Sequence, residues 1–361
     1  VKRKTKKCGL SYCDMILEKA KTNSKLDGVA GTATVFISHA WQYKFLDVLD
    51  ALEDHFKDEP EKIIWFDLVS NNQIKGPDLD YEWWATTFKD AIEQLGHTVM
   101  VMAPWNNPIP YQRAWCIFEA YCTSVKDATF EIAMSNNEHR AFIEECKHDP
   151  TSTINKMLSI VNAEKSEAWN PMDKERIHSV IRNEVGFAKI NSMVFEQMRD
   201  WVLKVALAEM EKVEKDTKDE TDLMYLVGKL YEDQGKYEEA EPLFKECLAK
   251  HKMIRGSDHP DTLNTMNNLA GLYESRGKYD EAEQLHKKSL AKCETILGSD
   301  HPDTLTSMNN LAVLYYSQGK YDEAEPLYKE CLAKCENSLG SQHPLAITTR
   351  ENLEDLQNLK G

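Results

Sequence analysis

The segment YQRAWCIFEAYC, residues 111–122, places a single carboxylate, Glu119, among large apolar side chains. The run of Trp115, Phe118 and Tyr121 indicates a helix with an apolar surface. A carboxylate in such a helix is either solvated on the outer face or held in a cleft, where it can act on a bound molecule. From this segment alone both interpretations stay open.

Short apolar runs predict the strands that position this helix. They lie at residues 34–38, 62–69 and 98–105, with a fourth candidate at 129–135. Segments with helical periodicity separate these runs. Strands that alternate with helices predict a parallel sheet covered on both faces, in an α/β domain over residues 30–150.

The loops after the first three strands should meet at one edge of the sheet, where open α/β sheets bind ligands. These loops are rich in side chains that contact ligands rather than fill cores: His39, Trp41, Asp67, Asn72, Gln73, Lys75, Trp105, Arg113 and Glu119. Asp67 and Gln73 could equally brace their loop.

Several common chemistries lack their motifs in this chain. There is no GxxxxGK[ST], GxGxxG, GxSxG or HExxH motif and no CxxC pair. This argues against a phosphate-binding loop, ordinary dinucleotide binding, a hydrolase elbow and a metal site. Cys116 close to His39 could form a nucleophile, but a cysteine before an apolar helix more often supplies a buried sulfur.

Four motifs, in this order, resemble the TIR (Toll/interleukin-1 receptor) domain: TVFISHAW, IIWFDLVSNNQ, TVMVMAPWNNP and RAWCIFEAYC. The resemblance implies a flavodoxin-like fold. In one large branch of the family, a glutamate in a WCxxE helix cleaves NAD at the nicotinamide–ribose bond, and that position corresponds to Glu119. A carboxylate there stabilises the positive charge of an oxocarbenium-like transition state.

The same resemblance implies which residues surround the substrate: Ser38, His39, Trp41, Asp67, Trp105, Arg113 and Trp115. Trp41 or Trp105 could stack on the nicotinamide, and Arg113 could offset the charge of Glu119. NAD would be a substrate rather than a tightly bound cofactor. Enzymes of this family generally act when their domains assemble, so self-association is expected.

The last third of the chain repeats with a fixed step. GKYEEAEPLFKECLAK begins at Gly235, GKYDEAEQLHKKSLAK at Gly277 and GKYDEAEPLYKECLAK at Gly319, so the steps are 277 − 235 = 42 and 319 − 277 = 42. Such a period predicts stacked helix pairs that bury their apolar faces against neighbouring repeats. We expect three repeats and a C-terminal cap over residues 221–361, after a helical bridge over 151–220.

With its NNLAxLY and DHPDTL motifs, this part resembles tetratricopeptide repeats (TPRs) of the kinesin-light-chain type. The resemblance implies an all-α solenoid that binds peptides. Because an amide both donates and accepts, asparagines on the concave wall would hold the backbone of an extended peptide: Asn267, Asn268, Asn309 and Asn310. Alternatively, one asparagine of each pair only caps or solvates its helix. The first repeat has Tyr225 and Leu226 at these positions.

The composition limits the choice of partners. A formal net charge of -16 disfavours nucleic acid and anionic membranes and favours basic protein partners. The chain has no apolar run of about eighteen residues, which a membrane span would need. Nine cysteines without a visible signal peptide indicate a reducing, cytoplasmic setting. The basic segment 1–29 is expected to be a helical extension.

Two hypotheses fit these patterns. In the first, the protein is a TIR-type NAD hydrolase whose repeats recruit a protein partner. In the second, it is a non-catalytic scaffold in which the TIR-like domain and the repeats only bind proteins. The repeats are a binding element in both hypotheses.

Overall fold

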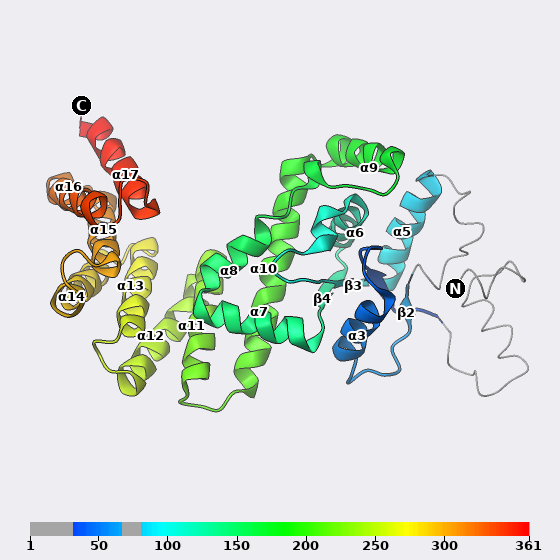
Figure 1. Cartoon of the computed structure of the whole chain (residues 1–361), viewed down its shortest axis with the longest axis horizontal. Coiled ribbons are helices and arrows are strands. Elements are labelled where there is room, and N and C mark those ends of the chain that lie inside the picture. Colours follow the sequence, from blue (N-terminus) through cyan, green and yellow to red (C-terminus); the bar gives the residue numbers. More distant parts are fainter. Residues whose placement is uncertain (1–31, 67–80, 361) are drawn as a thin grey trace, which may run out of the picture. The chain divides into compact units, whose positions relative to one another are not determined.

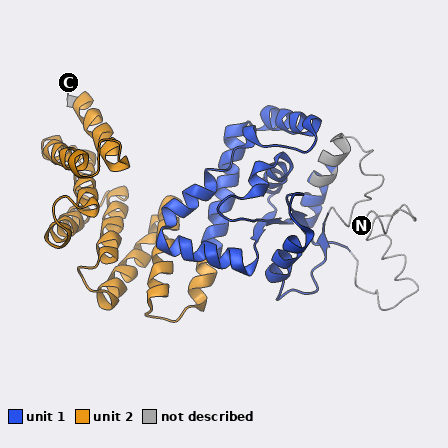
Figure 2. Cartoon of the chain, viewed as in Figure 1, with its two compact units in different colours: residues 1–205 blue, residues 206–361 orange. Residues whose placement is uncertain are grey.

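The structure is a computed structural model that describes residues 32–66 and 81–360. The chain divides into two compact units, residues 1–205 and 206–361 (Figure 2), and the boundary falls inside one helix. The division into four segments stays a prediction.

Part of the predicted architecture lies outside the described residues. This concerns the expected N-terminal helix and four residues of the loop after the second strand: Asp67, Asn72, Gln73 and Lys75.

The first unit contains the predicted parallel sheet (Figure 1). Its strands are β1 Val35–Ser38, β2 Ile64–Trp65, β3 His97–Val101 and β4 Thr129–Ala133. They lie in the order β2-β1-β3-β4, and every pair is parallel. This order is that of flavodoxin-like folds. All four residues of β1 are buried, which fits a central strand between two helical layers.

Helices cover both faces of this sheet. α3 Phe45–His55 covers one face, and α5 Tyr81–Leu95 and α6 Ala114–Val125 cover the other. The helices that follow are α7 Asn136–His148, α8 Pro150–Leu158, α9 Pro171–Glu184 and α10 Phe187–Lys212. Alternate residues of β1 point to opposite faces. Ile37 therefore shares a core cluster with Leu52 of α3, whereas Phe36 shares one with Ile92 of α5 and Ile117 of α6.

The second unit is a stack of helix pairs. Its helices are α11 Lys218–Asp233, α12 Tyr237–Ile254, α13 Pro260–Ser275, α14 Tyr279–Leu297, α15 Pro302–Ser317, α16 Tyr321–Ser338 and α17 Pro344–Lys360. Gly235, Gly277 and Gly319 join the two helices of each pair with φ of 72°, 71° and 73°. Glycine adopts this left-handed conformation without the clash that a Cβ causes.

The second and third pairs each begin with a His-Pro step. His259 caps α13 by accepting a hydrogen bond from the backbone N–H of Asp261 at 3.2 Å, and Pro260 takes the first helical position. His301 caps α15 in the same way. Both features favour the start of a helix. The histidine satisfies a free backbone N–H, and a proline at the first position loses no helical hydrogen bond.

The first helices of consecutive repeats touch one another. α13 contacts α15 and α15 contacts α17, in addition to the contacts within each pair. We call the surface of α11, α13, α15 and α17 the inner wall. Ala240, Ala282 and Ala324 of the second helices are fully buried, which confirms that small residues stand where paired helices approach closely.

Candidate functional site

Glu119 lies inside the first unit, next to the carboxyl end of β1. Ser38, the last residue of β1, donates a hydrogen bond from Oγ to Glu119 Oε2 at 2.6 Å. Only 1% of Ser38 and 7% of Glu119 is exposed. The structure therefore excludes the solvated outer face for this carboxylate, because it holds Glu119 in the interior.

Polar contacts fix α6 against the sheet around this carboxylate. Thr123 Oγ1 is hydrogen-bonded to the backbone oxygen of Glu119 at 2.8 Å and to Thr98 Oγ1 of β3 at 2.9 Å. Cys116 donates from Sγ to the backbone oxygen of His39 at 3.5 Å. A carboxylate that must act on a developing charge needs such support, because small displacements weaken its effect.

The other predicted residues of this site differ in exposure. Trp41 follows β1 and exposes 71% of its surface. The ring of His39 packs edge-on against Phe66, with 4.6 Å between ring centroids. Arg113 precedes α6 as its N-cap residue and, like Trp115, is half-buried. These residues flank the chain segments that carry Ser38 and Glu119.

Trp105 belongs to the core. Its ring centroid lies 5.6 Å from that of Phe142 in α7, and Lys156 Nζ lies 5.9 Å from the same ring. Its backbone N–H donates to Glu138 Oε2 at 2.8 Å. With 8% of its surface exposed, Trp105 has no open face on which a nicotinamide could stack. Trp41 is the exposed alternative.

Tyr43 is a structural residue of this region that the sequence patterns did not single out. Its hydroxyl donates to the backbone oxygen of Ala103 at 2.6 Å and accepts from the N–H of Ala103 at 2.9 Å. Burial raises the pKa of Tyr43 above its ordinary value. The neutral hydroxyl therefore ties the segment after β1 to the segment after β3. No motif in the sequence signalled this contact.

The cysteines of the described residues are buried and form no disulfides. Burial raises the pKa of Cys122 to about 12, and Cys116 is 3% exposed. This confirms the interpretation of Cys116 as a buried sulfur. Within residues 32–66 and 81–360, no group of His, Cys, Asp and Glu side chains could hold a metal ion.

The sequence motifs also did not indicate a second polar cluster in the first unit. His55 Nε2 and His97 Nε2 each lie 3.2 Å from Glu131 Oε2, and Lys204 contacts the other oxygen of Glu131. These hydrogen bonds hold the pKa of Glu131 well below its usual range. The four residues come from α3, β3, β4 and α10, so this cluster ties distant segments together.

The predicted asparagines on the inner wall have different partners. Asn267 Nδ2 donates to Ser307 Oγ at 2.9 Å, and Asn309 Oδ1 accepts from Thr349 Oγ1 at 3.1 Å. Both asparagines are buried and link neighbouring first helices. Asn268 is half-buried and donates to the hydroxyl of Tyr225 at 2.6 Å.

Asn310 differs from these three asparagines. It is half-buried on α15, like Asn268, but no other described residue engages its amide. Of the four asparagines, it is therefore the one whose donors and acceptor are open to a ligand.

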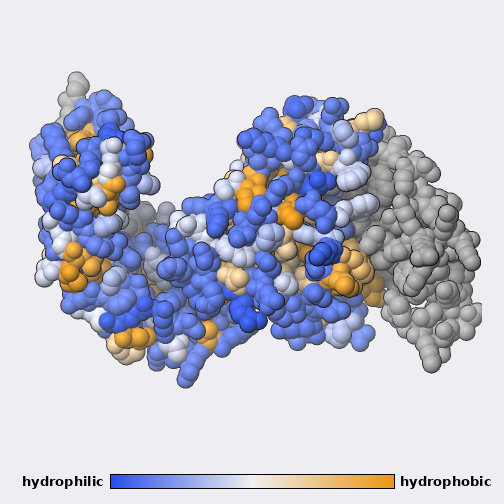
Figure 3. All heavy atoms as spheres, in the orientation of Figure 1, coloured by the Kyte–Doolittle hydropathy of each residue, from blue (hydrophilic) through white to orange (hydrophobic). Residues whose placement is uncertain are grey.

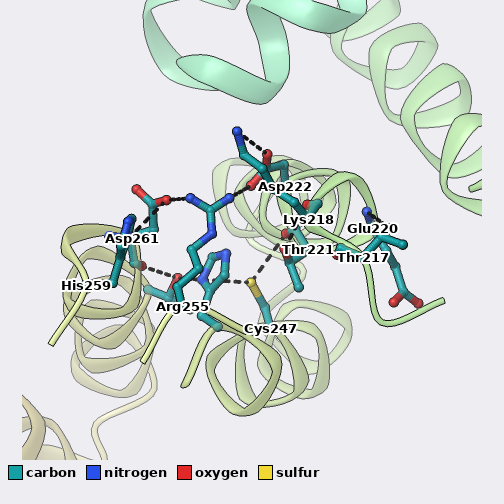
Figure 4. Close-up of polar contacts among 11 residues, drawn as sticks. Thr217, Lys218, Glu220, Thr221, Asp222, Cys247, Arg255, His259 and Asp261 are labelled. Carbon is teal, nitrogen blue, oxygen red and sulfur yellow. Dashed lines mark hydrogen bonds and ion pairs between the residues drawn. The ribbon is translucent and has the colours of Figure 1, made fainter. Parts of the chain in front are cut away.

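The junction of the first two repeats contains a network of hydrogen bonds and ion pairs that no sequence motif indicated (Figure 4). Arg255 donates to Asp222 Oδ1 of α11 at 2.9 Å and also bonds Asp261 of α13. In the same junction, His251 Nδ1 of α12 lies 2.9 Å from Thr265 Oγ1 of α13. The guanidinium thus bridges two carboxylates from consecutive first helices, which suits its planar, multi-donor geometry.

The surface of the array is mostly hydrophilic on the side visible in Figure 3, with small separate apolar patches. On this side, recognition would depend on polar and charged groups more than on a continuous apolar face.

Comparison with protein families identifies the second unit. The model of the tetratricopeptide repeat matches three overlapping stretches, residues 220–295, 267–337 and 303–361. Residues 220–361 form a TPR array. Helical repeat arrays form extended concave surfaces that they use for binding, which suggests a role in protein–protein interaction. No family model covers the parallel sheet, and no curated protein matches the chain.

Solved structures with similarity to the chain include other TPR-like arrays. A crystal structure of nearly identical TPR-like repeats from Podosopora anserina, described as kinesin light chain, is 23% identical, with a TM-score of 0.39 over 54% of this chain and 90% of that one. A variant of the same repeats is 24% identical, with a TM-score of 0.40 and the same coverage. BtubC (BKLC) from P. vanneervenii is 19% identical, with a TM-score of 0.38 over 62% of this chain and 81% of that one. None of the described helices is both long and apolar enough to cross a membrane.

Proposed function

We propose that this protein is a scaffold whose TPR array holds an extended segment of a protein partner along the inner wall. One observation carries the proposal: Asn310, half-buried on α15, has an amide that no described residue engages. An amide satisfies the N–H and C=O of a peptide unit together. Asn267, Asn268 and Asn309 support this wall, because their hydrogen bonds fix the first helices beside one another.

Selection of phage-displayed random peptides on the full chain tests this function. We expect the wild type to select peptides. Asn310→Ala should lower the affinity for these peptides about fivefold, since the loss of one hydrogen bond has that order of effect. Affinity is measured by fluorescence anisotropy. Asn337→Ala, on the exposed surface of the second helix α16, is the matched control and should keep wild-type affinity. Failure to select any peptide would contradict the proposal.

A second candidate function rests on Glu119. We propose that the first unit cleaves NAD at the nicotinamide–ribose bond when its domains self-associate. The buried position of Glu119 at the carboxyl end of β1 and its hydrogen bond from Ser38 support this candidate. In this reaction the carboxylate would stabilise the positive charge that develops on the ribose as the bond to nicotinamide breaks. Ser38 would orient it.

Nicotinamide release from NAD by concentrated protein, resolved by chromatography, tests this candidate. We expect Glu119→Gln to lose the activity, because the amide keeps the shape and removes the charge. Glu145→Gln, on the exposed surface of α7, is the control. No release by the wild type, even when crowded, would leave Glu119 with a structural role and the TPR scaffold as the function.

A further inference from the structure

Three residues of α13 lie on one face of the inner wall. Asn267, Gly271 and Glu274 follow the spacing i, i+4 and i+7, which places them one above the other on a helix. Asn267 and Glu274 both bond serines of α15: Asn267 donates to Ser307, and Glu274 accepts from Ser317 Oγ at 2.6 Å. This face is therefore turned toward the neighbouring first helix.

Glu274 is a half-buried carboxylate without an internal cation. No lysine, arginine or histidine of the described chain forms an ion pair with it, and its hydrogen-bond partner is the neutral Ser317. Burial raises the pKa of Glu274. The equivalent residue one repeat earlier, at 274 − 42 = 232, is also a glutamate, and there Lys229 Nζ lies 2.7 Å from the carboxylate. The second repeat thus lacks the cation that the first repeat supplies.

Glycine occupies the position of the missing lysine. Gly271 corresponds to Lys229, since 229 + 42 = 271. A Cβ built on Gly271 would meet a single atom within 4 Å, Glu232 Oε1 at 4.0 Å. At Gly228, by contrast, it would meet the ring of Phe244 at 3.0 Å, so packing explains that glycine. Packing does not require Gly271, although a glycine weakens a helix. Its effect is to leave space next to Glu232 of α11 and one turn before Glu274 of its own helix, as glycines do where a ligand comes close.

Asn267 contributes a second unused acceptor on the same face. The residue is 9% exposed, and its Oδ1 has no hydrogen-bond partner among the described atoms. A buried acceptor without a partner is unfavourable. A donor group of a bound segment would satisfy it.

The charged side chains within α13 and α15 have one sign. α13 carries Asp261 and Glu274, α15 carries Asp303, and neither helix contains a lysine or an arginine. The lysines of the neighbouring second helix α14 are Lys287, Lys288 and Lys292. Asp261 is paired with Arg255, so Glu274 is the carboxylate of α13 that favours a cation.

We propose that Glu274, Gly271 and Asn267 form a subsite for a lysine or arginine side chain of the bound protein segment. The proposal rests on the proposed scaffold function and specifies its partner as a segment with a basic residue. The basic side chain pairs with Glu274 as Lys229 pairs with Glu232. Gly271 provides the space, and Asn267 Oδ1 accepts an N–H of the same segment.

Peptide selection distinguishes this subsite from the scaffold function itself. On the wild type, we expect the selected phage-displayed peptides to share a lysine or arginine at one position. On Glu274→Gln, peptides should still be selected but without that preference. Peptides without a shared basic residue on the wild type would overturn the subsite and leave the scaffold function intact. The absence of any selected peptide would overturn both.

A lysine of the protein itself, introduced into the subsite, gives a sharper test. Gly271→Lys recreates the Lys229–Glu232 arrangement one repeat later. We expect this variant to bind a selected basic peptide with about tenfold lower affinity than the wild type. Gly271→Ala keeps most of the space, so its affinity for the same peptide should stay within about twofold of the wild-type value. Circular dichroism verifies that both variants are folded. Unchanged affinity in Gly271→Lys, or equal losses in both variants, would overturn the proposal.

A double-mutant cycle assigns the effect to the charge pair. Replacing the basic residue of a selected peptide by norleucine should weaken binding to the wild type about fivefold and binding to Glu274→Gln less than about twofold. Equal effects on the two proteins would show that the basic residue binds elsewhere and would overturn the subsite.

Discussion

Ser38 Oγ donates a 2.6 Å hydrogen bond to Glu119 Oε2, although 81 residues separate them in sequence. Both side chains are almost completely buried. A buried carboxylate is stable only when hydrogen bonds or charges compensate for its lost hydration. The serine at the end of β1 is therefore a condition for the position of Glu119 in α6, whichever function the carboxylate has.

Removal of this donor should destabilise the first unit. We expect Ser38→Ala to lower its free energy of unfolding by about 1–3 kcal/mol, because it withdraws a partner from a buried charged group. All eight tryptophans lie before residue 206, so tryptophan fluorescence in urea reports on this unit. Ser159→Ala, an exposed serine after α8, should change stability by less than about 0.5 kcal/mol. Equal values for both variants would argue against the importance of the hydrogen bond.

Two glycines of one repeat should respond to alanine with opposite signs. Gly277 has φ of 71°, so Gly277→Ala should destabilise the TPR array by about 1–2 kcal/mol. Gly271 is helical with open space beside it, so Gly271→Ala should stabilise the array by about 0.5–1 kcal/mol. Urea unfolding followed by circular dichroism measures both. Destabilisation by Gly271→Ala would mean that the helix surface there has no room for a methyl group.

A buried histidine should make the TPR array sensitive to acid. His286 is 1% exposed, neither ring nitrogen has a partner among the described residues, and burial lowers its pKa from 6.5 to about 4. Between these two values the unfolded chain binds a proton that the folded chain does not. The free energy of unfolding that is linked to the buried neutral His286 is therefore fully present above pH 6.5 and is lost as the pH falls toward 4.

Replacement of His286 by the residue of the preceding repeat tests this. Position 286 corresponds to Phe244, since 286 − 42 = 244. We expect His286→Phe to reduce the loss of stability between about pH 7 and pH 4.5 by about 2 kcal/mol. His251, whose pKa burial also lowers to about 4, stays in place and accounts for part of the remaining loss. An unchanged pH dependence would contradict the assignment.

The arginine between the first two repeats should be important for their junction. Arg255 is bonded to both Asp222 and Asp261 (Figure 4). Arg255→Met leaves these carboxylates without their shared cation, so we expect a loss of about 2–3 kcal/mol in the stability of the array. Lys252→Met, three residues earlier and exposed, is the matched control. Comparable stability of the two variants would show that the network contributes little.

The sequence determined much of the architecture by itself. The 42-residue step, the Gly-Lys-Tyr turns and the His-Pro helix starts predict the helix pairs, because local backbone preferences decide each of these features. The apolar runs likewise predict the parallel sheet. The second strand is the least complete, since only Ile64 and Trp65 pair within the described residues.

The tertiary structure decided the environment of the candidate functional residues. Sequence motifs treated Trp41 and Trp105 alike, but packing on Phe142 buries Trp105 and leaves Trp41 exposed. Asn309 and Asn310 are neighbours in sequence, yet Asn309 bonds Thr349 across helices, whereas no described residue engages the amide of the half-buried Asn310.

These differences arise because burial and hydrogen-bond partners depend on segments that are distant in the chain. Ser38 and Glu119 illustrate this, since each motif contains one half of the pair and only the fold brings the halves together. The repeats make the same point for Glu232 and Glu274, where an identical residue type has a lysine partner in one repeat and open space in the next. Local preferences determine elements, whereas the charge, burial and free partners of a side chain are properties of the packed molecule.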